Sequence, residues 1–134
     1  MGQALPLICY EVIFPANTRV RARPDLLVQI TNDAWFGTYA GPFQHLAQAR
    51  ARAIEQGLPL IRAANTGVSA VVAPSGGLVA TLALGQGGHL DAPLPAPLPP
   101  TLYSRLGDWP TIILLMLGLL ALSRRKPEPS PFSV

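Results

Sequence analysis

The sequence is poor in charged residues, cysteine and histidine, and each shortage excludes a class of protein. Of its 134 residues 13% are charged and 49% are hydrophobic, which argues against a disordered chain. A single cysteine, Cys9, rules out an internal disulfide framework, and two histidines are too few to complete a Cys/His zinc cluster with it. The net charge of +3 is too small and scattered to indicate a nucleic-acid partner. No signal peptide is expected, because no basic residue precedes Pro6, which interrupts the apolar run.

The hydrophobic pattern over the first two thirds of the chain predicts an α/β fold. Short apolar runs alternate there with a stretch, Gly41 to Gly57, in which apolar residues recur at helical spacing. Gly57 is expected to end this helix as its C-cap. The length allows one domain or part of one. The expected strands, including a hairpin around the Pro-Ser-Gly-Gly turn, cover 5–10, 26–30, 60–64 and 68–84.

The C-terminal part of the chain changes character. A proline-rich connector is expected at 93–108, an uncharged apolar helix at 109–123, and a basic, Pro/Ser-rich tail at 124–134. Fifteen helical residues would span roughly 22 Å, less than the ~30 Å of a bilayer core, so a buried or interfacial helix is one interpretation. Trp109 at one end and three consecutive basic residues at the other favour a transmembrane helix with a cytoplasmic tail, which is our prediction.

Cys9 directly follows the first apolar run and is a candidate nucleophile. A strand followed by a turn would hold a thiol rigidly and expose it beside backbone N–H groups. A lone cysteine is also commonly a small buried hydrophobic residue, and spacing alone leaves both interpretations open. Three interpretations are open for Glu11. On a strand it would share the face of Cys9, and in a turn it would form a hydrogen bond with the backbone. It would otherwise be a solvated carboxylate at the start of a helix, where the helix dipole stabilises it.

The loop after the second expected strand combines polar and aromatic residues. Asn32 and Asp33 are expected to hold the loop through side-chain to backbone bonds. Trp35 and Phe36 either line an apolar substrate pocket or pack onto the core. His45, near the start of the expected helix, is expected to be structural.

Two groups of arginines stand out in a chain with few charges. Arg19, Arg21 and Arg23 form one cluster, and Arg50 and Arg52 form another. A solvated surface explains both. At a membrane face these side chains would instead meet anionic headgroups.

Six motifs resemble, in the right order, those of the carbon–nitrogen hydrolase (nitrilase) superfamily. The NDAWFG stretch and the Trp-Pro entry to the last apolar segment resemble in particular the membrane-bound N-acyltransferases that modify bacterial apolipoproteins. The resemblance covers about 5–126. The motifs are ICYE at 8–11, RPD at 23–25, NDAWFG at 32–37, QH at 44–45, RARAIE at 50–55 and RAANTGVSA at 62–70.

The resemblance implies part of an αββα sandwich and an acyl transfer that uses a Glu–Lys–Cys triad and no metal or cofactor. The cysteine attacks a phospholipid ester, and the acyl group then passes to the amine of the diacylglyceryl-cysteine that begins an apolipoprotein. Cys9 matches the nucleophile. Tyr10 and Glu11 match the next two positions, on which activity depends, and the Tyr10 N–H would help to bind the oxyanion. Trp35 matches an aromatic residue on the lipid side of the site, and Phe36 beside it is also expected to contact substrate.

The sequence departs from this family in its triad. The triad Glu and Lys precede the cysteine in the family, whereas eight residues precede Cys9 and the only lysine is Lys126. We therefore expect 1–92 to be the C-terminal part of a nitrilase-like domain, inactive without the missing N-terminal portion of the enzyme. The implied place is the bacterial inner membrane, with the catalytic part on the periplasmic side.

Two other functions remain open at this point. The chain is alternatively a half-domain of a nitrilase-type amidase acting on a small soluble amide. The second alternative is a non-catalytic, membrane-anchored remnant of such an enzyme. Binding to membranes would distinguish the first of these from the acyltransferase, and the effect of replacing Cys9 would distinguish the second.

Overall fold

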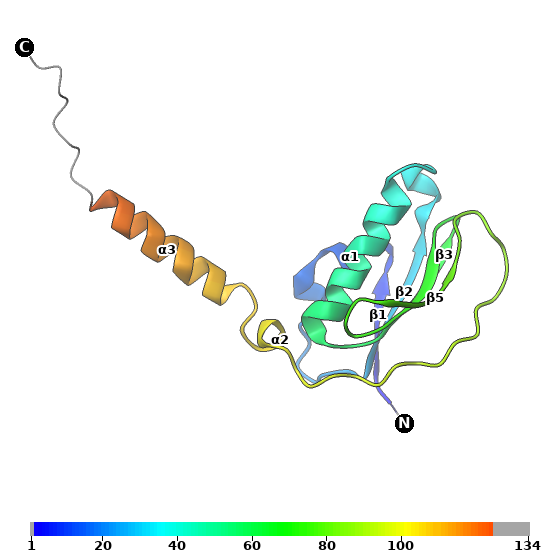
Figure 1. Cartoon of the computed structure of the whole chain (residues 1–134), viewed down its shortest axis with the longest axis horizontal. Coiled ribbons are helices and arrows are strands. Elements are labelled where there is room, and N and C mark those ends of the chain that lie inside the picture. The colour runs from blue at the N-terminus through cyan, green and yellow to red at the C-terminus, as the bar shows by residue number, and fades with distance from the viewer. Residues whose placement is uncertain (1, 125–134) are drawn as a thin grey trace, which may run out of the picture.

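The computed structural model describes residues 2–124 and contains one five-stranded mixed sheet, so the α/β class is confirmed (Figure 1). The strands follow one another in sequence order across the sheet. The first three run parallel and the last two antiparallel, because a crossover through a helix joins β2 to β3 whereas a short turn joins β4 to β5. The strands are β1 (Ala4–Ile8), β2 (Leu26–Asn32), β3 (Leu60–Asn65), β4 (Ser69–Val72) and β5 (Leu78–Leu82).

The first strand ends two residues earlier than the hydrophobic pattern predicts. Cys9 and Tyr10 belong to a 3-10 helix, η1 (Cys9–Ile13), rather than to β1. Cys9 has a φ of +50°, which turns the backbone out of the strand. Two further 3-10 helices, η2 (Pro15–Thr18) and η3 (Asp33–Phe36), follow β1 and β2 on the chain.

One face of the sheet is covered by the long helix α1 (Gly41–Gln56) (Figure 1). Alternate strand residues point at this helix because successive side chains of a strand face opposite sides. Gly57 ends the helix in the left-handed conformation, with a φ of +63°, as expected of a C-cap glycine. The core lies between helix and sheet and consists mainly of Leu7, Leu27, Leu46, Ala49, Ala53, Leu60 and Val72.

The opposite face of the sheet is largely open and apolar. Ile8 is 53% exposed and Ile30 is 55% exposed, although isoleucine is among the residues most often buried. Residues 2–124 contain no second sheet and have a helix layer on one side of the sheet only, which is the arrangement expected for part of an αββα sandwich.

The expected connector is an extended segment that returns past the C-terminal end of α1. The Leu98 N–H donates to the Gly57 carbonyl over 2.9 Å, and Arg23 donates to the Leu98 carbonyl over 2.8 Å. A short helix, α2 (Leu102–Leu106), follows this segment, which the sequence had predicted to be entirely connector.

The last helix, α3 (Trp109–Ser123), has the bounds predicted for the apolar segment and projects away from the sheet (Figure 1). None of its residues is buried. The expected transmembrane helix is not found in the described residues, because no helix there has both the length and the hydrophobicity to cross a membrane. Fifteen residues rise only about 22 Å. Apart from Arg124, the predicted tail lies outside the described residues.

Candidate active site

Cys9 lies at the carboxyl end of β1, at the edge of the sheet where the three parallel strands end. Its side chain is half-buried. A positive φ at a residue other than glycine costs on the order of 1–2 kcal/mol, and strain of this kind concentrates at functional sites. The backbone therefore turns sharply at the residue that presents the candidate nucleophile.

Glu11 stabilises this turn through two hydrogen bonds. Its carboxylate accepts a hydrogen bond of 2.7 Å from the Ile8 N–H, and its carbonyl accepts one of 3.0 Å from the Asn17 side-chain amide. Of the interpretations left open by the sequence, the structure favours the one in which Glu11 bonds to the backbone. Its carboxylate stabilises the peptide that leads into Cys9.

The aromatic residues around Cys9 differ in exposure. Tyr10 is 53% exposed and its ring lies 6.3 Å from the ring of Phe36. Phe36 is half-buried, and its ring packs edge-on against His45 at 5.2 Å. Trp35 is 85% exposed, so it does not pack onto the core of the described residues. The structure thus brings Tyr10 and Phe36 together and leaves Trp35 projecting from the same edge of the sheet.

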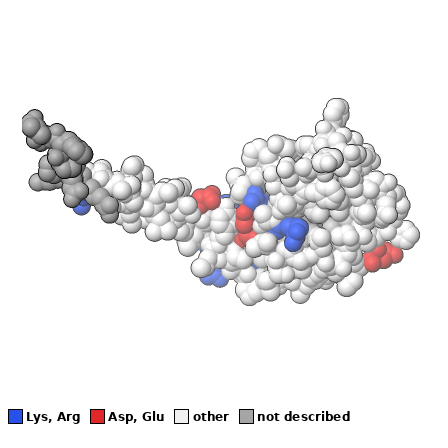
Figure 2. Space-filling model, turned by 45° about the horizontal axis from the view of Figure 1, so that its top comes forward, with Lys and Arg blue, Asp and Glu red and all other residues white. Residues whose placement is uncertain are grey.

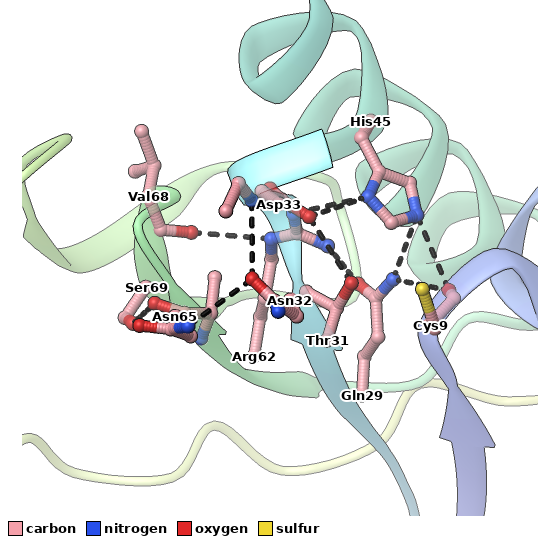
Figure 3. Close-up of polar contacts among 12 residues, drawn as sticks. Cys9, Gln29, Thr31, Asn32, Asp33, His45, Arg62, Asn65, Val68 and Ser69 are labelled. Carbon is pink, nitrogen blue, oxygen red and sulfur yellow. Dashed lines mark hydrogen bonds and ion pairs between the residues drawn. The ribbon is translucent and has the colours of Figure 1, made fainter. Parts of the chain in front are cut away.

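Beneath Cys9 lies a group of four buried polar side chains, Gln29, Asp33, His45 and Arg62, which we call the buried polar cluster (Figure 3). Arg62 donates to the Gln29 side-chain oxygen, to the Asp33 carboxylate and, over 3.1 Å, to the Val68 carbonyl. The other Asp33 oxygen lies 2.9 Å from His45 Nδ1.

The buried polar cluster contacts the backbone carbonyl of Cys9. Gln29 Nε2 donates to the Cys9 carbonyl over 3.1 Å and lies 3.1 Å from His45 Nε2. Since the Gln29 oxygen accepts from Arg62, its amide nitrogen faces Cys9 and His45 and has one N–H for each. His45 Nε2 also lies 3.2 Å from the Cys9 carbonyl, and His45 Nδ1 lies on the Asp33 side of the ring. The peptide carbonyl of Cys9 is therefore fixed by a chain of bonds that reaches from β1 to β3.

The charges of the cluster balance in a fully buried environment. The side chains of Arg62 and Asp33 form an ion pair and both have no exposed surface. Burial lowers the pKa of the Arg62 guanidinium, and the Asp33 carboxylate opposes this shift, as does negative charge on Cys9.

Two local features allow the cluster to assemble. A Cβ at Gly67 would overlap the Asp33 carboxylate, so only glycine leaves room for Asp33 at this position. Asn32 accepts 3.1 Å bonds from the Ala34 N–H and from the Asn65 amide, which ties η3 to the end of β3. Asn32 holds the loop as expected, whereas Asp33 is directed into the buried polar cluster instead.

The sequence suggested Cys9 as a candidate nucleophile and His45 as a structural residue, but it did not indicate Gln29 and Arg62 as members of the site. A signal for both was present. Each occupies a position at which strand alternation places a side chain toward the helix, where leucine or valine would otherwise stand. Buried charges are almost always paired, so an arginine at such a position implies an acidic partner nearby. Within residues 2–124 no three His, Cys, Asp or Glu side chains are grouped as metal ligands.

A half-buried cysteine at a strained turn, placed at the carboxyl edge of parallel strands, defines an α/β protein with a candidate nucleophilic thiol. The chain belongs to the carbon–nitrogen hydrolase family, whose model matches residues 1–96.

Within this family, the chain is similar to apolipoprotein N-acyltransferases. The chain is 58% identical over 124 residues to an apolipoprotein N-acyltransferase of Bradyrhizobium diazoefficiens and 56% identical over 126 residues to one of Rhodopseudomonas palustris. These matches cover 92% and 93% of this chain but 23% and 24% of the relatives, so the chain spans about a quarter of their length.

Solved structures share the fold. An amidase from a Nesterenkonia species, which carries a covalent acetamide adduct at its active-site cysteine, is 31% identical, with a TM-score of 0.52. The match covers 64% of this chain and 35% of the amidase. A carbon–nitrogen hydrolase from Helicobacter pylori has a TM-score of 0.54 at 19% identity, which shows the fold alone; it covers 64% of this chain and 38% of that structure.

Proposed function

We propose that this chain is the nucleophile-bearing part of an apolipoprotein N-acyltransferase. The observation that carries the proposal is the placement of Cys9, the only cysteine, at a strained turn whose carbonyl the buried polar cluster fixes. The amidase of similar fold carries its covalent adduct on a cysteine. Identity to acyltransferases over nine tenths of the chain favours acyl transfer over amide hydrolysis.

The proposed reaction has two steps. The Cys9 thiolate attacks the carbonyl carbon of a phospholipid ester; the C–O bond breaks and the lysophospholipid leaves as an alcohol after gaining a proton. The amine of a diacylglyceryl-cysteine then attacks the thioester, the C–S bond breaks, an amide forms, and the amine proton is lost as the thiolate is released. A thioester divides one difficult transfer into two easier ones. The Tyr10 N–H, at the start of η1, donates to the oxyanion in both steps.

The general base and the catalytic lysine of this proposal come from outside residues 2–124. Those residues contain no lysine, since Lys126 is the only one in the sequence. Glu11 is occupied by the Ile8 N–H and acts as a positioning residue for the turn. We therefore expect no turnover by the chain alone. The open face of the sheet, with its exposed Ile8 and Ile30, is where the second sheet of an αββα sandwich would pack.

The membrane contact of this proposal is made by α3. A helix that is apolar all round and has no buried residue is stable where lipid or protein covers it. Trp109, at its N-terminal end, is 66% exposed and is suited to the membrane interface. We propose that α3 inserts into the inner membrane from the periplasmic side, and that the exposed Trp35 contacts the phospholipid substrate at the Cys9 edge of the sheet.

The experiment co-expresses this chain with the preceding segment of a close acyltransferase relative in membranes. After incubation with phospholipid, intact-mass spectrometry is expected to show one acyl group on the chain, removable by hydroxylamine as a thioester is. The matched controls are Cys9→Ala and the chain without its complement, and both are expected to stay unmodified.

Acylation that persists in Cys9→Ala would refute Cys9 as the nucleophile. Acylation and turnover by the chain alone would refute its dependence on residues outside it. Release of ammonia from a small amide, with no acyl transfer to an apolipoprotein peptide, would show that the amidase function is correct instead.

A further inference from the structure

We propose that a cleft at the foot of α3 binds the phosphate group of an anionic phospholipid at the membrane surface. The inference rests on the proposed contact of α3 with the membrane. The cleft has a volume of about 440 Å³ and lies between the segment 18–24 and helix α2. Four arginines line it, Arg19, Arg21, Arg23 and Arg105, and we call it the arginine cleft.

Two of the four arginines are fixed by the fold. Arg23 donates to the Gln56 and Leu98 carbonyls over 3.0 and 2.8 Å, so backbone oxygens hold it in place without cancelling its charge. Arg19 lies over the ring of Tyr103 and meets Asp108, its one acidic partner, at 3.5 Å.

The other two arginines are available to a ligand. Among residues 2–124, the guanidinium groups of Arg21 and Arg105 have no hydrogen-bond or ion-pair partner. Glu55, the other acidic residue near α2, is already paired with Arg52. The cleft therefore keeps a net positive charge with unused N–H donors, and the planar guanidinium group matches phosphate oxygens in a bidentate way.

The position of the cleft indicates a lipid headgroup as the source of that phosphate. Leu106 and Trp109, both at least half exposed, line its edge where α3 begins. Figure 2 shows charged side chains gathered where the helix joins the body, whereas the helix surface beyond is uncharged up to its far end. Insertion of α3 would place the arginine cleft at headgroup depth, where basic side chains are attracted to anionic lipid.

The arginine cleft is separate from the candidate active site. Its lining includes Pro24, which lies just before β2, and Gln56, at the end of α1. Cys9 follows the carboxyl end of β1, which runs parallel to β2 and so ends at the opposite edge of the sheet. The bound lipid would anchor and orient the domain and would not be the acyl donor at Cys9.

The test measures binding of the full chain to phosphatidylcholine vesicles with and without phosphatidylglycerol, by flotation at low salt. Each basic residue near an anionic surface is worth about fivefold in affinity, so Arg21→Gln with Arg105→Gln is expected to weaken binding to the anionic vesicles about 25-fold. Binding to pure phosphatidylcholine, which depends on α3, is expected to stay unchanged. The charge-conserving pair Arg21→Lys and Arg105→Lys is expected to bind with intermediate affinity, because lysine keeps the charge but cannot bind phosphate in a bidentate way.

Three other outcomes would contradict the arginine cleft, the membrane contact of α3 or the choice of lipid as ligand. If the Gln pair binds anionic vesicles as well as the unmodified chain does, the arginine cleft proposal fails and the membrane contact of α3 stands. If the unmodified chain binds neither vesicle, both fail. If inorganic phosphate binds with the same dependence on Arg21 and Arg105 while anionic vesicles are not preferred, the site takes free phosphate and the lipid assignment is wrong.

Discussion

Replacing Arg62 by methionine tests whether the buried polar cluster stabilises the fold as well as the Cys9 turn. Methionine keeps an unbranched side chain of similar length and removes the guanidinium group. The substitution deletes the donors to the Gln29 oxygen, the Asp33 carboxylate and the Val68 carbonyl. Among the described residues, Asp33 then keeps polar contacts only with His45 and Thr31.

The magnitude follows from the burial of both charges. The side chains of Arg62 and Asp33 have no exposed surface, so water cannot replace the lost partner. Breaking a buried ion pair by removing one member costs about 3–5 kcal/mol, because the other charge is left uncompensated. Domains of ordinary stability have about 5–15 kcal/mol in total, so Arg62→Met is expected to lose a large part of it.

The assay is urea unfolding of the full chain in detergent micelles, followed by circular dichroism. The matched control is Arg50→Met, an exposed arginine whose one hydrogen bond goes to the Gly76 carbonyl, with an expected loss of about 1 kcal/mol. Adding Asp33→Asn to Arg62→Met is expected to recover about 1–2 kcal/mol, because the second substitution removes the unpaired charge. A loss below about 1 kcal/mol for Arg62→Met would contradict a fully buried Arg62–Asp33 pair, since it would mean that water reaches Asp33.

Three further predictions concern single residues. Cys9→Gly is expected to be about 1 kcal/mol more stable than Cys9→Ala in unfolding experiments, the reverse of the usual order, because the φ of +50° strains every residue but glycine; equal stabilities would contradict the strain. Gly67→Ala is expected to cost about 1–3 kcal/mol, since its Cβ would overlap the Asp33 carboxylate, and a neutral substitution would contradict this packing. Burial raises the pKa of Glu55 above 4.5, against the opposing effect of Arg52. The folded state then holds this proton more tightly than the unfolded state, so the stabilisation is complete below pH 4.5 and declines as pH rises through the raised pKa. Glu55→Gln is expected to remove that decline, and an unchanged pH profile would contradict it.

The sequence predicted most elements because their signals are local. Apolar runs located the strands, helical spacing located α1, and Gly57 supplied its C-cap. The run from 5 to 10 was extended too far because Cys9 and Tyr10 are apolar enough to continue a strand. The positive φ at Cys9 ends the strand. The local sequence does not predict such an angle for a residue other than glycine.

The candidate site could be predicted only in part, since its geometry depends on distant segments. Cys9 and Glu11 are two residues apart, and their turn was among the possibilities that the sequence allowed. Gln29 and Arg62 lie 33 positions apart and meet only because β2 and β3 pair in parallel, with Gln29 opposite Arg62. Strand alternation marked both as buried polar residues, but it could not say which charges they would meet.

The proposed division of the site between this chain and residues outside it has a physical consequence. All groups that fix the Cys9 carbonyl, from Gln29 and His45 to Asp33 and Arg62, lie within the described residues. The hydrogen bonds that hold the turn therefore need no group from outside residues 2–124. The proposed base and lysine would have to approach from the open side of Cys9, because the side facing α1 is already occupied by the buried polar cluster. Such a chain is expected to present a correctly oriented thiol without the groups that activate it, which separates the geometry of the nucleophile from its reactivity.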